Sequence, residues 1–119
     1  MDKVAANREF VLSLLKAYAD GDLRTIEKGL DLNFVNWRWS TGEVSRHQYL
    51  REIEILFAAR EFSHIEPTHT VTDETSVAVE LRMTTKLDGK TLEFLQHNLF
   101  LIEDGRLVGL RQYGDAPLS

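Results

Sequence analysis

The chain of 119 residues has the length of a single domain, and with 43% hydrophobic residues it can bury one core. Its net charge of -5, with acidic and basic residues interspersed, offers no basic stripe, so we expect neither a nucleic-acid partner nor a membrane partner. The absence of cysteine excludes disulfides, thiolate nucleophiles and zinc–thiolate or iron–sulfur sites. The charged N-terminus lacks the apolar run of a secretory signal, and no stretch reaches transmembrane length. The sequence therefore predicts one cytoplasmic domain over residues 1–119.

The N-terminal third predicts two helices. Apolar residues of the first helix share one face at spacings i, i+3, i+4 and i+7, namely Val11, Leu14, Leu15 and Tyr18. Gly21 can close this helix in the left-handed conformation. Asp22 can cap a short second helix whose apolar residues, Leu23, Ile26 and Leu30, again share a face.

The next segment predicts a strand followed by a third helix. Residues 33–39 alternate, with Val35, Trp37 and Trp39 on one side and Phe34, Asn36 and Arg38 on the other. Ser45 followed by Gln48 is a capping box, which predicts that a helix begins there and runs to about Arg60.

The remaining residues predict four strands in a meander, with approximate spans 64–72, 75–87, 90–102 and 106–113. Asp88-Gly89 and Asp104-Gly105 are the two-residue loops of type I′ hairpins. Pro67 lacks an N–H group, so we expect the first of these strands to lie at an edge or to carry a bulge. Three helices followed by such a meander predict an α+β fold, with the helices packed on a curved antiparallel sheet.

Both faces of this sheet are expected to be covered. In the strand over residues 90–102 one side carries Phe94, Gln96, Asn98, Phe100 and Ile102, and the other carries Leu95, His97, Leu99 and Leu101. Neither side has the polar character of a water-facing strand. The helices can cover one side, and a second copy of the chain is the simplest cover for the other, so we expect a homodimer through Leu95, His97, Leu99 and Leu101.

Three motifs and their order along the chain resemble a known superfamily. They are Asp20-Gly21-Asp22-Leu23, then Ser45-Arg46 at the third helix start, and Asp104-Gly105-Arg106-Leu107 through Arg111-Gln112-Tyr113. The chain resembles the nuclear transport factor 2-like superfamily and, within it, the SnoaL-like proteins, which include ketosteroid isomerase, polyketide cyclases, small dehydratases and limonene epoxide hydrolase. The resemblance implies a cone-like barrel with a pocket between the helices and the concave face of the sheet.

The resemblance also places three catalytic positions of ketosteroid isomerase on this chain. The isomerase's protonated oxyanion-hole acid corresponds to Asn98, and its proton-abstracting aspartate falls at or next to Trp37. Its oxyanion-hole tyrosine corresponds to Leu14. All three residues differ from those of the isomerase, so steroid isomerisation by that mechanism is not expected.

The strand phases and the resemblance together predict the wall of the pocket. Its expected ligand-binding residues are Tyr18, Trp37, Leu81, Met83, Phe94, Gln96, Leu110 and Gln112. Carboxamides donate hydrogen bonds without titrating, so Asn98, Gln96 and Gln112 can hold a carbonyl or enolate oxygen. The alternative is that these amides bond to one another or to ordered water.

Few residues are candidates to move a proton in this pocket. His69 shares a face with Ile65 and Val71 and is predicted to point inward, either as a general base or as a core histidine bonded to the backbone. Asp115 follows the last strand, where SnoaL-like cyclases carry an acid, but a solvated residue is preferred there. No metal-ligand spacing occurs, and we expect neither a metal nor a cofactor.

The leading hypothesis is a pocket for a small apolar molecule that bears a carbonyl or hydroxyl group. It includes a cofactor-free isomerase, cyclase or dehydratase in which Asn98 and Gln112 polarise an oxygen and His69 or Asp115 moves a proton. Two alternatives stay open, a non-catalytic ligand-binding domain and a protein-interaction domain whose cone is filled by its own side chains.

Overall fold

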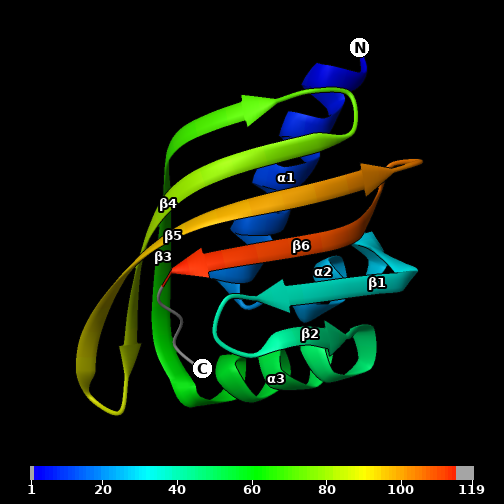
Figure 1. Cartoon of the computed structure of the whole chain (residues 1–119). Helices are drawn as coiled ribbons and strands as arrows, with labels where there is room; N and C mark the ends of the chain where they lie inside the picture. Colours follow the sequence, from blue (N-terminus) through cyan, green and yellow to red (C-terminus); the bar gives the residue numbers. More distant parts are fainter. Residues whose placement is uncertain (1, 115–119) are drawn as a thin grey trace.

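The computed structural model describes residues 2–114, in which three helices pack against a curved sheet (Figure 1). The helices are α1 (Lys3–Asp20), α2 (Leu23–Gly29) and α3 (Arg46–Ala59). The strands are β1 (Leu30–Arg38), β2 (Gly42–Ser45), β3 (Arg60–Thr72), β4 (Ser76–Leu87), β5 (Lys90–Glu103) and β6 (Arg106–Gly114). The predicted α+β cone is thus confirmed, with α1 crossing behind β4, β5 and β6 in the view of Figure 1.

Short polar side chains and glycines set the boundaries of the helices, as the sequence predicts. Gly21 ends α1 at a φ of 74°, and its N–H group bonds to carbonyls of the last turn. The carboxylate of Asp22 accepts from the Thr25 N–H group at 3.1 Å and begins α2. The Ser45 hydroxyl accepts from the Gln48 N–H group at 3.2 Å and begins α3.

The sheet has the order β2-β1-β6-β5-β4-β3, and its connections are mostly hairpins. The two predicted type I′ turns are present, with φ of 52° at Asp88 and 51° at Asp104, each followed by a glycine at 74°. The strand β1 joins the sheet parallel to β6, which makes the sheet mixed. The sequence did not reveal this pairing or the short strand β2, because neither depends on a local pattern.

The core lies between α1 and the inner face of the sheet. Val11 on α1 and Val77 and Val79 on β4 are fully shielded from solvent. Phe34 on β1 packs against Tyr49 on α3 with 5.0 Å between the ring centroids, which ties the third helix to the same core. The described helices include none that is long and apolar enough to cross a membrane.

The strand β3 lies at the edge of the sheet and carries the bulge that Pro67 predicts. Pro67 pairs with Leu81, but His69 pairs with Glu80, so the register shifts by one residue between them. A shift of one residue moves every following side chain to the opposite face. The prediction that His69 points inward is therefore wrong, because the bulge places it on the exposed outer face.

Candidate functional site

A cavity opens between the helices and the inner face of the sheet. It contains about 540 Å³ of empty space including its open mouth, and about 50 Å³ of this can hold the centre of a water molecule. The cavity is therefore narrow. Most of its wall is apolar and comes from four elements: Leu14 and Leu15 of α1, Leu81 and Met83 of β4, Phe100 of β5, and Leu107 and Leu110 of β6.

Most of the residues predicted for the wall lie in it. Those that line the cavity are Tyr18, Leu81, Met83, Gln96, Asn98, Leu110 and Gln112. Phe94 lies opposite Met83 and packs on the core, but it is not part of the cavity wall. Asp115 lies outside the described residues.

Trp37 does not face the cavity, contrary to prediction. In the parallel pairing of β1 with β6 it lies opposite Arg111, on the outer face of the sheet. There its ring lies 5.3 Å from that of Tyr113 and 4.2 Å from the Arg111 guanidinium. Its neighbours Asn36 and Arg38 pair with Leu110 and Gln112 and share their inner face. The aromatic side of the strand thus faces outward and the polar side inward.

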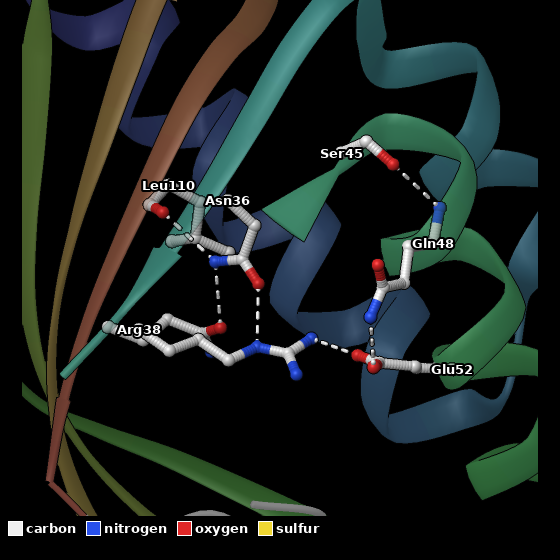
Figure 2. Close-up of polar contacts among 7 residues, drawn as sticks. Asn36, Arg38, Ser45, Gln48, Glu52 and Leu110 are labelled. Atoms are coloured by element: carbon white, nitrogen blue, oxygen red, sulfur yellow. Dashed lines mark hydrogen bonds and ion pairs between the residues drawn. The ribbon is translucent and has the colours of Figure 1, made fainter. Parts of the chain in front are cut away.

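Asn36 is the centre of a buried polar network (Figure 2). It has no solvent-exposed surface. Its amide nitrogen donates to the Leu110 carbonyl and to the Gln112 side-chain oxygen, at 3.0 Å in each case. Its amide oxygen accepts from Arg38 Nε at 2.8 Å. Every polar atom of this side chain is therefore used, as burial requires.

The network continues from β1 to the third helix through an ion pair. Figure 2 shows the Arg38 guanidinium pointing to Glu52 of α3, where Nη2 lies 2.6 Å from a carboxylate oxygen. Both side chains are largely shielded, with 14% and 29% of their surface exposed. Gln48 donates to the other Glu52 oxygen at 3.2 Å. This chain of contacts fixes α3 to β1 and, through Asn36, holds the Gln112 side chain.

Two tyrosines line the cavity from the helical side. Burial raises the pKa of Tyr18, although the positive charges of Arg60 and Arg38 oppose this effect. Burial also raises the pKa of Tyr49, and the nearby Tyr18 raises it further. Both phenols therefore stay protonated at neutral pH and remain hydrogen-bond donors.

Arg60 holds Tyr18 in place at the C-terminal end of α1. Its guanidinium donates to the Tyr18 carbonyl, and to the Ala19 carbonyl at 3.3 Å. It also lies over the Phe57 ring, 4.3 Å from the centroid, and 5.2 Å from that of Tyr18. Burial lowers the pKa of this arginine. Arg60 thus caps the helix whose last turn carries Tyr18.

Asn98 is the most deeply buried polar residue of the cavity wall, with 3% of its surface exposed. Its amide nitrogen donates to the Gln96 side-chain oxygen at 3.1 Å. Its own oxygen is shielded from solvent and has no hydrogen-bond partner within residues 2–114. A buried acceptor without a partner is costly in a folded protein, so this atom marks a place where a donor is expected.

Comparison with known proteins agrees with this architecture. The model of the SnoaL-like domain matches residues 11–110. The chain belongs to the SnoaL-like family. A search of curated protein sequences gave no match for this SnoaL-like chain.

Solved structures share the SnoaL-like fold at low sequence identity. An LEH-like epoxide hydrolase from M. tuberculosis superposes with a TM-score of 0.86 at 16% identity, over 96% of this chain and 86% of that protein. A Jannaschia sp. CCS1 protein named as a SnoaL-like polyketide cyclase gives 0.82 at 19% identity, over 97% and 89%. A Catenulispora acidiphila protein with a ketosteroid isomerase-like fold, in complex with trimethylamine, gives 0.77 at 14% identity, over 88% and 84%. At these identities the likeness shows the fold alone.

Within residues 2–114, the wall of this SnoaL-like cavity carries none of the usual groups for proton abstraction. Among the described residues that line it, the titratable ones are Tyr18 and Tyr49, and none is a carboxylate or a histidine. Within the same part of the chain, no three histidine, aspartate or glutamate side chains gather as metal ligands. The arrangement can donate hydrogen bonds to a ligand and exclude water from it.

Asn36, Arg38, Tyr49 and Glu52 were not predicted as part of this site. The sequence placed Tyr49 on the buried face of α3, but a buried helix face does not show whether a residue lines a cavity. For Asn36 and Arg38 the signal was the alternation in β1, where Phe34 shares their side. The other side of the strand carries Val35, Trp37 and Trp39, and its apolar character led to the wrong prediction that this side faces the cavity.

Proposed function

We propose that the cavity binds a small, mostly apolar molecule that bears a hydroxyl or carbonyl group. The observation that carries this proposal is the composition of the wall, in which apolar side chains surround a few neutral hydrogen-bonding groups. These groups are the phenols of Tyr18 and Tyr49 and the amides of Asn98 and Gln112. Ligand pockets typically combine an apolar lining with a few placed polar groups of this kind.

The dimensions of the cavity limit the ligand. Because about 50 Å³ of the empty space can hold the centre of a water molecule, a slender molecule or a single ring fits better than a rigid system of several rings. The neutral wall also favours an uncharged ligand, since a buried charge without an opposite charge is strongly disfavoured.

A cofactor-free isomerase, cyclase or dehydratase is the second candidate, supported by the family and by the two phenols. A protonated tyrosine in a water-excluding site can polarise a substrate oxygen or donate a proton to it. Proton abstraction needs a base, and the described wall supplies none. Ligand binding, with or without a reaction, is therefore the more directly supported function.

The experiment is native mass spectrometry of the purified protein, followed by a screen of small alcohols and ketones by thermal shift. The decisive comparison in both measurements is with a variant whose cavity is blocked. Ile65 lies in the wall on the edge strand β3 and is only partly buried, so Ile65→Trp fills space at a tolerant position. Val71→Trp on the same strand is the matched control, because Val71 is 59% exposed.

We expect the native protein and Val71→Trp to bind the same molecules and Ile65→Trp to lose them, with all three folded by circular dichroism. Equal binding by Ile65→Trp would place the ligand elsewhere and contradict the proposal. If no molecule co-purifies or binds to the native protein, the alternative of a protein-interaction domain with a filled cone is favoured instead.

A further inference from the structure

We infer that the cavity selects a hydroxyl group over a carbonyl group, through a donor on Gln112 and an acceptor on Asn98. This inference rests on the proposed binding function and specifies its ligand. The two residues are direct cross-strand neighbours on the inner face, with Asn98 on β5 opposite Gln112 on β6. Side chains in such a pair lie about 5 Å apart at Cβ and can contact the same ligand atom.

The buried network determines which end of the Gln112 amide faces the cavity. Arg38 has only donors, so the oxygen of Asn36 must face it, and the Leu110 carbonyl only accepts, so the nitrogen of Asn36 must face that group. The same Asn36 nitrogen meets Gln112, which must therefore present its oxygen. The amide nitrogen of Gln112, which is a donor, is left for the cavity.

Asn98 presents the opposite polarity. Its nitrogen is directed to the Gln96 oxygen, and its own oxygen is the buried acceptor that has no partner in the described part of the chain. A donor and an acceptor thus stand side by side in the wall.

A hydroxyl group satisfies both atoms at once. Its oxygen accepts from Gln112, and its hydrogen is donated to Asn98. A ketone can accept from Gln112 or from a tyrosine, but it has no hydrogen to donate, so it leaves the Asn98 oxygen unpaired. A site with a buried polar group of this kind rejects analogues that cannot pair with it.

The test compares three probes of similar shape, cyclohexanol, cyclohexanone and methylcyclohexane. Binding is followed by NMR titration of the protein, including the side-chain amide signals of Asn98 and Gln112. We expect cyclohexanol to bind about fivefold to a hundredfold more tightly than cyclohexanone, the range that corresponds to leaving one buried acceptor unpaired. The Gln112 amide signal is expected to shift with both oxygenated probes.

Two variants separate the roles of the two amides. Asn98→Leu removes the acceptor, so it should weaken cyclohexanol and abolish the preference for the alcohol while cyclohexanone binding changes little. Gln112→Met removes the donor that both probes use, so it should weaken both alike. Asn33→Leu, at an exposed asparagine of β1, is the matched control and should keep the native preference.

The outcomes distinguish this inference from the proposed function. Equal or tighter binding of cyclohexanone to the native protein overturns hydroxyl selection and leaves the binding proposal intact. A preference that persists in folded Asn98→Leu also overturns it. If Asn98→Leu does not fold, a Gln112→Met variant that weakens only one of the two oxygenated probes overturns the proposed roles of the two amides. If none of the three probes binds at its highest soluble concentration, the binding proposal itself fails.

Discussion

The middle of strand β5 departs from the usual distribution of residues between the two faces of a sheet. On the inner face the amides Gln96 and Asn98 are 7% and 3% exposed, whereas on the outer face their neighbour Leu95 is 60% exposed. In this stretch two polar side chains are therefore buried, while the apolar side chain of Leu95 on the opposite face meets solvent. The difference teaches that residue polarity alone does not identify the solvent-exposed face of this sheet. On the inner face the Asn98 amide nitrogen donates to the Gln96 oxygen, and on the outer face Leu95 has no cover in the single chain.

The largest effect is expected from breaking the inner network at Asn36. Asn36→Leu removes three hydrogen bonds at a fully buried site and leaves Arg38 Nε and the Gln112 oxygen without this partner. We expect the free energy of unfolding to fall by about 2 to 4 kcal/mol. Urea denaturation measures this change, with Asn33→Leu as the exposed control on the same strand. Similar stability of the two variants would contradict the importance assigned to the network.

A buried carboxylate on the inner face gives the next largest effect. In Asn98→Asp the new group is buried and faces the Gln96 oxygen, so we expect its folded-state pKa to lie above its unfolded value of about 3.9. The destabilisation is then absent below that value, grows as the pH rises through the folded pKa, and reaches about 1 to 3 kcal/mol near neutrality.

Urea midpoints of this variant and the native protein, compared from about pH 4 to about pH 8, test the sign. A difference that stays constant with pH would show that the Asn98 position is more open to solvent than its burial indicates.

On the outer face the expected effect is on assembly rather than on stability. The homodimer remains a prediction, consistent with the exposure of Leu95. Leu95→Glu is expected to change the unfolding free energy of the monomer by no more than about 0.5 kcal/mol, and to shift a dimer to monomer in sedimentation. Ile55→Glu on α3, where the side chain is 54% exposed, is the control. A native protein that sediments as a monomer would show that this face needs no second copy.

The smallest effect is expected at the exposed carboxylate of Asp73. Its effect on stability should depend on pH with the opposite sign to that of Asn98→Asp. The pKa of Asp73 is lowered, first by the backbone N–H group of Thr75 and then by hydrogen bonds from Ser76. Its contribution is present above the unfolded pKa and is lost as the pH falls through the folded pKa. We expect Asp73→Asn to be less stable than the native protein at neutral pH and to approach it in acid.

Acid unfolding curves of the two proteins test this expectation, with Glu9→Gln at an exposed α1 carboxylate as the control. Curves that run parallel down to the acid limit would mean that Asp73 contributes nothing through its charge.

The candidate site was predictable where regular alternation holds. In β4 and β5 the phase is uninterrupted, so Leu81, Met83, Gln96 and Asn98 were correctly assigned to the inner face. The prediction failed at His69, where a bulge changes the phase, and at Trp37, where the choice between two sides depended on the pairing of β1. The network of Asn36, Arg38, Glu52 and Gln112 was out of reach, because it joins residues of three different elements, β1, α3 and β6.

The amino-acid sequence by itself determined the three helices and the strands other than β2, because caps, type I′ turns and hydrophobic periodicity act over a few residues. It also determined the curved sheet with its helical cover, since these faces can only be buried against each other. Only the tertiary structure decided which side of β1 faces the cavity and which atom of each amide remains available. The physical reason is that both depend on partners from other strands: the parallel register with β6 orients Asn36, and Asn36 in turn orients Gln112.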